Sequence, residues 1–191
     1  MPGTRTFLAL PLPAPVRAAL AELRTALPPP PRGLRGATLS QPHLTLVFLG
    51  DLEDDALADV RARARGVAAG TATFEADLAG VGAFPSPARA RVAWVGWGGG
   101  AAAVTALHAE LVAALDRPRD PRPFTPHVTL ARARDPVDAR AWLAAAPDAW
   151  RSPAWRVDGL DVVSSELRRE GAVHEVLERC PFGAPGAARA R

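Results

Sequence analysis

The amino-acid sequence predicts an α+β fold that contains a rough internal duplication. Segments with the two-residue alternation of a β-strand and segments with the apolar spacing of an α-helix follow one another in a similar order in both halves of the chain. One short motif, Pro-His-aliphatic-Thr-Leu, occurs in each half, at residues 42–46 and 126–130. Hydrophobic residues make up 48% of the 191-residue chain, which is typical of a globular protein with a substantial core.

The first half is expected to begin with a strand and a helix. Residues 5–10 (RTFLAL) have the composition of a strand, which Pro11 ends. A helix is expected to begin near Pro15, because proline suits the first helical turn, and the prolines at 28–31 end it. Its apolar face recurs at helical spacing and consists of Val16, Ala19, Leu20, Leu23 and Leu27.

The first copy of the motif lies in the next predicted strand. Residues 32–40 are expected to form a loop, and residues 43–50 (HLTLVFLG) a strand, because a proline directly before the histidine favours an extended backbone. Acidic residues at positions 51–55 suit the start of a second helix. The buried face of that helix is expected to contain Leu57, Val60, Ala64 and Val67.

The second half is expected to contain an antiparallel pair of strands, a helix and the second copy of the motif. Residues 73–78 alternate apolar and polar, residues 80–85 predict a turn, and residues 89–97 predict the returning strand. A third helix follows the glycines at 98–100 and turns Val104, Leu107, Leu111 and Leu115 inward. Residues 117–126 predict a loop that leads to the second motif strand.

The chain is expected to close with a short helix and a hairpin. The helix is predicted over residues 136–146, and the hairpin strands over residues 155–165 and 172–179. Residues 183–191 lack apolar periodicity and are expected to form a flexible tail. Residues 1–182 are therefore expected to be a single domain.

Charge and cysteine content limit the class of protein. The formal net charge is +3 and all 23 basic residues are arginine, which is compatible with a phosphate-bearing ligand but does not require one. The single cysteine, Cys180, excludes an internal disulfide, and no zinc-type spacing of cysteine and histidine is present. The sequence shows no signal-peptide pattern and no apolar run near the roughly 20 residues that span a bilayer. We expect a cytoplasmic protein without membrane association, and a monomer.

The duplicated motif is the strongest functional signal in the sequence. Side chains two residues apart share one face of a strand, so His43 lies beside Thr45 and His127 beside Thr129. The same alternation places Leu44, Leu46 and Phe48, or Val128 and Leu130, on the opposite face. One His-x-Thr sequence in a strand would be ordinary, but the chain has only four histidines and two of them occur in this pattern. The two copies predict two halves of one site.

The two motifs resemble those of the two-histidine (2H) phosphoesterases. Within them, the chain is similar to the LigT-like RNA 2′,3′-cyclic phosphodiesterases, historically called 2′-5′ RNA ligases, whose motifs have the forms HLTLxFLG and HVTLAR. These stand here as residues 43–50 and 127–132, and the stretch GVGAFPSPARARVAWVG is also similar. The resemblance implies two lobes related by a pseudo-twofold axis. Each lobe would have an antiparallel sheet flanked by helices, and the motif strands would meet in a central cleft.

The resemblance also implies an activity: metal-independent hydrolysis of RNA 2′,3′-cyclic phosphate ends to 2′-phosphomonoesters, with weak 2′-5′ RNA ligase activity. Imidazoles suit the two proton transfers because their pKa lies near working pH, and the resemblance makes His43 the acid and His127 the base. The hydroxyls of Thr45 and Thr129 would donate to phosphate oxygens. No cofactor is implied, and two histidines without an evident third ligand do not predict a metal site.

The sequence allows two interpretations of each of two further residues, Arg132 and Phe48. The resemblance places Arg132 on the phosphate, whereas strict alternation places it on the face opposite His127, so that Arg134 competes for the role. Phe48 occupies a position where the resemblance suggests stacking near the nucleobase, and a core phenylalanine is an equal alternative. His108 is expected to be structural or solvated, and His174 is expected to pack within the closing hairpin.

Three functions remain open from the sequence. The first is the RNA 2′,3′-cyclic phosphodiesterase just described. The second is an enzyme for small cyclic nucleotides or an ADP-ribose cyclic phosphate, and the third is an RNA-end binding protein without turnover. The intact histidines and threonines in both motifs favour an enzyme over the third alternative.

Overall fold

The computed structural model describes residues 3–37, 41–118, 120–168 and 171–183. Its first half contains β1 (Thr4–Pro11), α1 (Ala14–Ala26), β2 (Leu34–Gly36), β3 (His43–Leu52) and α2 (Asp54–Gly70). The middle contains β4 (Phe74–Ala76), β5 (Leu78–Phe84), the 3-10 turn η1 (Pro87–Arg89), β6 (Ala90–Trp97) and α3 (Ala101–Ala114). The last part contains β7 (His127–Val137), α4 (Arg140–Ala144), β8 (Trp155–Val157), β9 (Gly159–Arg168) and β10 (Gly171–Pro181).

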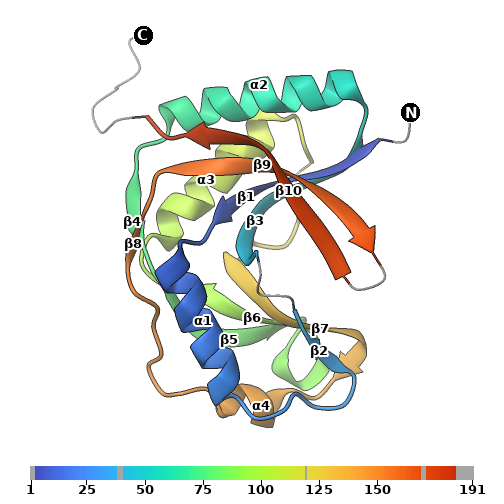
Figure 1. Ribbon diagram of the computed structural model, residues 1–191, viewed down its shortest axis with the longest axis vertical. Coiled ribbons are helices and arrows are strands. Elements are labelled where there is room, and N and C mark those ends of the chain that lie inside the picture. Colours follow the sequence, from blue (N-terminus) through green and yellow to red (C-terminus); the bar gives the residue numbers. More distant parts are fainter. Residues whose placement is uncertain (1–2, 38–40, 119, 169–170, 184–191) are drawn as a thin grey trace.

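The predicted α+β architecture is confirmed, and its strands pair antiparallel throughout the described chain. The main sheet has the order β10-β9-β1-β3-β7-β6-β5, with β2 paired to the free side of β7. Its two halves meet between the motif strands β3 and β7, where Leu44 and Val128 are the one pair in register. The two expected sheets are thus joined at a single point, which the two lobes share (Figure 1).

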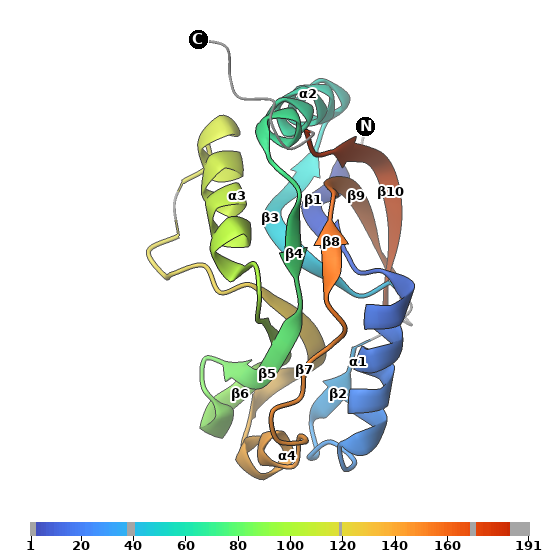
Figure 2. The same ribbon diagram turned by 90° about the vertical axis from the view of Figure 1, so that its left-hand side faces the viewer.

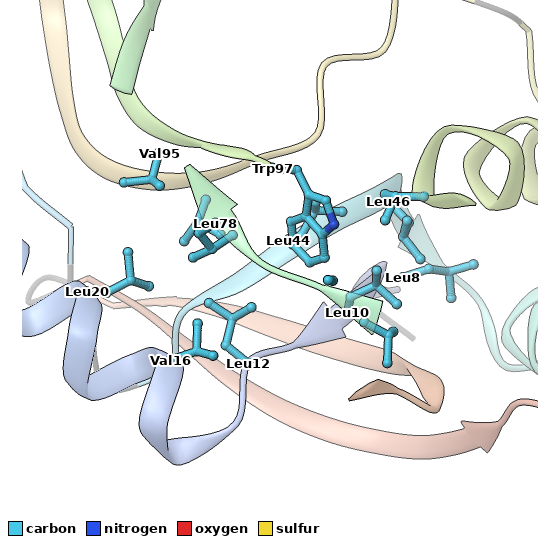
Figure 3. Packing of buried hydrophobic residues seen from close by; sticks show 14 of the residues in the cluster. Leu8, Leu10, Leu12, Val16, Leu20, Leu44, Leu46, Leu78, Val95 and Trp97 are labelled. Carbon is cyan, nitrogen blue, oxygen red and sulfur yellow. The ribbon is translucent and has the colours of Figure 1, made fainter. Parts of the chain in front are cut away.

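Two helices cross from one lobe to the other. Helix α1 follows β1 of the first lobe but lies beside the sheet of β5, β6 and β7, whereas α3 follows β6 of the second lobe but lies beside β3 (Figures 1 and 2). The crossing makes one hydrophobic cluster out of residues from both lobes. Figure 3 shows Val16 and Leu20 of α1 in the same cluster as Leu44 of β3 and Val95 of β6.

The predicted α1, α2 and α3 are confirmed. Proline occupies the first turn of α1, and Val16, Ala19, Leu20 and Leu23 are its buried residues. Asp54 and Asp55 lie in the first turn of α2, where their charge complements the helix dipole. The inward face of α3 contains Val104, Leu107 and Leu111.

The prediction for residues 73–97 was wrong in its pairing. The segment 73–78 does not form one strand, because the chain turns a corner at Asp77, whose carboxylate pairs with Arg151 at 2.6 Å. The part before the corner, β4, pairs with β8, and the part after it, β5, pairs with β6. The predicted turn at 80–85 is therefore strand as far as Phe84, and the reversal occurs over Pro85 to η1.

Two other boundaries differ because strands extend where a partner is present. The predicted helix over 136–146 is reduced to the five residues of α4, since β7 continues to Val137, which pairs with Ala90. The predicted loop 32–40 contains β2, which pairs with residues 131–133 of β7; residues 38–40 lie outside the described residues. The predicted closing hairpin is formed by β9 and β10, while β8 belongs to the small sheet with β4.

The end of the described chain lies against α2. The N–H of Gly183 donates to the carbonyl of Ala68 at 3.2 Å. The rest of the predicted tail, residues 184–191, lies outside the described residues. Among the helices that the structure describes, none is long and apolar enough to cross a membrane.

Candidate active site

All six predicted site residues line one cavity of about 730 Å³, which opens where β3 meets β7. His43, Thr45 and Phe48 come from β3, and His127, Thr129 and Arg132 come from β7. Further residues of β7, residues of β1, β2, β9 and β10, and the segments before the motifs complete the described lining: Arg5, Phe7, Arg35, Gly36, Ala37, Gln41, Pro42, Val128, Ala133, Arg134, Ser165, Ala172 and His174.

The register between the motif strands explains why both motifs reach the same cavity. Leu44 is the middle residue of His43-Leu44-Thr45, and it pairs antiparallel with Val128, the middle residue of the second copy. This register directs His43 toward Thr129 and Thr45 toward His127. Because Leu44 and Val128 are buried on the core face, the histidines and threonines share the opposite face.

A β-bulge lies at the same position of each motif and shifts the faces of the residues after it. On β3, Thr45 pairs with Ala9 and Val47 with Leu8, which leaves Leu46 without an opposite residue. On β7, Thr129 pairs with Trp94 and Ala131 with Ala93, which leaves Leu130 without one. Each bulge inserts one residue, so two consecutive residues are buried and the alternation slips by one.

Because of the bulges, Phe48 and Arg132 lie on the opposite strand face from the one predicted for them. Strict alternation placed both side chains on the face opposite the histidines, and the structure places both at the cavity. Phe48 is 49% exposed, so the alternative of a core phenylalanine is wrong. The guanidinium of Arg5 lies over its ring, 4.5 Å from the centroid, as a cation–π contact.

Arg132 lies directly beside one motif hydroxyl. Its Nη2 donates to Oγ1 of Thr129 at 3.3 Å. Burial lowers the pKa of Arg132, but a guanidinium still stays charged near neutral pH. Arg5, Arg35 and Arg134 also line the cavity, and no carboxylate is among its described lining residues. The cavity is therefore suited to an anion.

Backbone hydrogen bonds hold both histidines in the same tautomer. Nδ1 of His43 donates to the carbonyl of Gln41 at 2.9 Å, and Nδ1 of His127 donates to the carbonyl of Thr125 at 2.8 Å. In each case the acceptor lies two residues earlier in the chain. With Nδ1 occupied as a donor, Nε2 is the nitrogen that can take up or release a proton in both rings.

The unbound site favours neutral imidazoles. Burial is the largest cause that lowers the pKa of both His43 and His127, and the positive charge of Arg132 lowers both further. The backbone hydrogen bonds oppose this effect in each ring. His174 lowers the pKa of His43 in addition, so the two otherwise similar environments differ at this point.

Aromatic rings orient each histidine, and the sequence did not identify them. Phe7 of β1 stacks on His43 with centroids 4.8 Å apart, and Phe84 of β5 meets His127 edge-on at 5.0 Å. His174 of β10 lies edge-on to His43 at 5.1 Å, in accord with the packing role expected for it. These contacts join strands that are distant in sequence. Only the position of Phe84 in a stretch similar to the family could have pointed to one of them.

The donor set in the described chain offers no metal centre. No group of three or more histidine, cysteine, aspartate or glutamate side chains lies close enough to hold a metal ion among these residues. The arrangement instead places two imidazoles, two hydroxyls and a guanidinium around one cavity. Such a set can bind a phosphate diester and move protons on two sides of it.

Comparisons with known proteins find relatives that match most of the chain. The family model described as the 2′-5′ RNA ligase superfamily matches residues 12–169. A Thermus thermophilus protein named RNA 2′,3′-cyclic phosphodiesterase is 36% identical over 182 residues, which cover 92% of this chain and 88% of that protein. A Methanothermobacter thermautotrophicus protein of the same name is 27% identical over 182 residues, 91% of this chain and 96% of that protein.

Solved structures have the same fold. A crystal structure of a Thermus thermophilus protein is 34% identical, has a TM-score of 0.76 and covers 95% of this chain and 99% of its own. The structure of E. coli LigT complexed with 3′-AMP has a TM-score of 0.76 at 24% identity, and covers 95% and 99%. The second likeness shows the fold alone.

Proposed function

This chain belongs to the 2′-5′ RNA ligase superfamily, and on that premise we propose that it hydrolyses RNA 2′,3′-cyclic phosphate ends to 2′-phosphomonoesters without a metal ion. One observation carries the proposal: two histidines, each held in the same tautomer by a backbone carbonyl, line one cavity with the two motif threonines. The enzymes named RNA 2′,3′-cyclic phosphodiesterase that match most of the chain support the same substrate.

The reaction needs one proton taken and one proton given. Water attacks phosphorus as it loses a proton to Nε2 of the neutral histidine. The bond between phosphorus and the 3′ oxygen breaks, and that oxygen takes a proton from Nε2 of the protonated histidine. The products are a 2′-phosphate and a free 3′ hydroxyl. The two rings have then exchanged protonation states, which solvent restores.

The remaining site residues have roles in binding. Thr45 and Thr129 donate hydrogen bonds to the non-bridging phosphate oxygens, and Arg132 adds a charge-assisted contact from the same side as Thr129. Phe48, exposed at the cavity under Arg5, stacks with the nucleobase. If the 5′ hydroxyl of a second RNA attacks phosphorus in place of water, loses its proton to the base and expels the same 3′ oxygen, the product is a 2′-5′ diester, which is the weak ligase activity.

The assignment of roles follows the family resemblance, with His43 as the acid and His127 as the base. The proposed binding partner is an RNA end. The cytoplasmic location and the monomeric state of the protein stay predictions. Light scattering of the purified protein in solution tests the monomer.

The test uses an oligonucleotide that ends in a 2′,3′-cyclic phosphate, incubated with the protein in EDTA. We expect a product that is heavier by one water and carries its phosphate on the 2′ oxygen. His43→Ala and His127→Ala should each lower kcat by roughly 10²–10⁴, because each removes one proton transfer. Loss of activity in EDTA that a divalent ion restores would refute the metal-independent mechanism.

A parallel reaction with free cyclic mononucleotides separates the substrate classes. If these are hydrolysed with a higher kcat/KM than the oligonucleotide, the small-nucleotide alternative replaces the RNA one. If neither is hydrolysed and the oligonucleotide still binds, the protein is an RNA-end binding protein.

A further inference from the structure

A histidine outside the cavity contacts the β-bulge that directs Phe48. Nδ1 of His108, on α3, donates to the carbonyl of Leu46 at 2.8 Å. Leu46 is the residue of β3 that the bulge leaves without an opposite residue. His108 is not among the residues that line the cavity. Its contact with the site therefore passes through the backbone of β3.

The same histidine also contacts the segment that leads into the second motif. Its ring lies flat on Phe124, with centroids 3.9 Å apart and planes at 5°. Phe124 precedes His127 by three residues. His108 thus connects the bulge of one motif strand with the approach to the other.

The second bulge is held by a different group. The carbonyl of Leu130, at the equivalent position of β7, accepts a hydrogen bond from the N–H of Ala37 at 2.7 Å. Ala37 belongs to the segment that leads into the first motif. A backbone donor of this kind survives most substitutions, whereas the bulge on β3 depends on a side chain.

Strand β3 contains a further bulge on the other side of Phe48, and its carbonyl also accepts a hydrogen bond from a side chain. Thr6 pairs with Gly50 and Phe7 with Phe48, which leaves Leu49 without an opposite residue. Its carbonyl accepts from Nη2 of Arg117 at 2.9 Å, just beyond the C-terminal end of α3. Phe48 therefore lies between two bulges, and α3 with the residues after it supplies the donor to each.

The donors to the bulge carbonyls stabilise the bulges. The extra residue of a bulge is left out of the ladder, so its carbonyl needs another donor when it is buried. Leu46 is buried, at 2% exposure, and His108 supplies that donor. Without it, the strand can satisfy the carbonyl by returning to regular pairing, which would turn Phe48 to the core face.

We propose that His108 is a positioning residue for the substrate cavity, which acts by holding the Leu46 bulge and thereby keeps Phe48 at the nucleobase. The inference rests on the proposed function, in which Phe48 contacts the base. His108 affects binding of the base-bearing substrate and leaves the proton transfers at His43 and His127 in place.

The test is a double-mutant cycle between His108→Leu and Phe48→Ala. His108→Leu removes the donor at similar volume, and it should raise KM by about fivefold or more, the factor for the weaker end of base–aromatic stacking, with kcat nearly unchanged. His108→Asn keeps a donor at the position of Nδ1 and should restore KM. In a Phe48→Ala background, His108→Leu should have no further effect, because the two act through one contact. Thr105→Val on the same helix is the matched control, since Thr105 bonds only to Ala101 within α3 among the described residues.

A binding measurement separates this inference from the proposed function. The dissociation constant for adenosine 2′-monophosphate, measured by calorimetry, should follow the same pattern and needs no turnover. If the wild type hydrolyses cyclic phosphates but the two substitutions act additively, this inference fails alone. If the wild type binds the nucleotide and hydrolyses nothing, the proposed function fails, but the double-mutant cycle can still be measured from the dissociation constants.

Folding of the variants is controlled separately. Phe124→Leu removes the ring that stacks on His108 but keeps the hydrogen-bond donor, so it should raise KM by less than His108→Leu. If His108→Leu does not fold, His108→Asn carries the test: a folded Asn variant with a strongly raised KM overturns the proposal. So does a folded Leu variant that lowers kcat as much as it raises KM.

Discussion

At the scale of residues, the site consists of two nearly equivalent histidine environments. Each ring donates from Nδ1 to a carbonyl two residues earlier, and each packs against a phenylalanine from another strand of the sheet. His174 breaks this equivalence, because it lies beside His43 and no third histidine lies beside His127 in the described chain. Acid–base catalysis needs the two rings in different protonation states, so small differences of this kind matter.

The lowered pKa values predict the pH dependence. Burial lowers the pKa of both histidines below the ordinary value of 6.5, so both rings are neutral in the free enzyme at higher pH. Since one ring must be protonated, kcat/KM should fall as the pH rises through neutrality. A bound phosphate anion favours the imidazolium, so the profile of kcat should lie at higher pH than that of kcat/KM. Steady-state kinetics from about pH 5 to 9 test both; a kcat/KM that rises above neutrality would contradict the prediction.

The roles of the two histidines are separable with an activated leaving group. A substrate whose leaving oxygen is replaced by sulfur hardly needs a general acid. On it, His43→Ala should recover much of its rate and His127→Ala should not. Single-turnover rates on the two substrates measure this, and rescue of His127→Ala instead would reverse the assignment.

Arg132 is expected to contribute more to phosphate binding than Arg134. Arg132→Ala removes a charge-assisted contact and should cost about 1.5–3 kcal/mol in kcat/KM. Arg134→Ala is the matched control, because both side chains line the cavity but only Arg132 contacts a motif threonine. A larger loss in Arg134→Ala would transfer the role to that residue.

At the scale of elements, the β-bulges decide which side chains the strands present to the cavity. The motif strands have the same order of buried and partly exposed residues, from His43 to Phe48 and from His127 to Arg132. A bulge at equivalent positions thus supplies an aromatic ring from one lobe and a guanidinium from the other. The pseudo-twofold arrangement holds for the backbone, while the side chains at the ends of the motifs differ in chemistry.

Asp77 is expected to stabilise the corner between β4 and β5 without affecting the site. Its carboxylate accepts from the N–H of Gly99 at 3.1 Å and pairs with Arg151 at 2.6 Å. Asp77→Ala should lower the free energy of unfolding by about 1–2 kcal/mol, because the ion pair is partly exposed and counts for little beyond the hydrogen bonds. Asp77→Asn, which keeps an acceptor, should lose less. Urea unfolding measures the change, and equal losses in both variants would attribute it to the charge alone.

At the scale of the whole molecule, the crossed helices link the two lobes. Because α1 lies beside the second lobe and α3 beside the first, one hydrophobic cluster contains residues of both. The tie between α4 and the end of α1, where Nε1 of Trp142 donates to the carbonyl of Pro28 at 2.8 Å, adds to this connection. A cavity between two halves can then keep its geometry, since neither half can move without disturbing the core.

We therefore expect residues 1–182 to unfold as one unit. Neither lobe can bury its apolar surface alone, so a single cooperative transition should be observed. Differential scanning calorimetry should give equal calorimetric and van't Hoff enthalpies. Two separated transitions would indicate two independently stable lobes.

Local sequence patterns were sufficient to predict part of this protein. The two motifs predicted that His43, Thr45, His127 and Thr129 share strand faces, and the structure brings these side chains to one cavity. Helices α1 to α3 followed from the apolar spacing in their own residues. These features need no knowledge of what lies on the neighbouring strands.

Features that depend on hydrogen-bond register could not be predicted from local patterns, because the register is set by the pairing strands. The faces of Phe48 and Arg132 are set by bulges, and a bulge exists only relative to the strand that pairs with it, here β1 or β6. The separation of β4 from β5, and the donors that His108 and Ala37 supply to the bulge carbonyls, likewise join residues far apart in the chain. A strict two-residue alternation assumes an unbroken ladder, and for that reason it placed Phe48 and Arg132 on the wrong face.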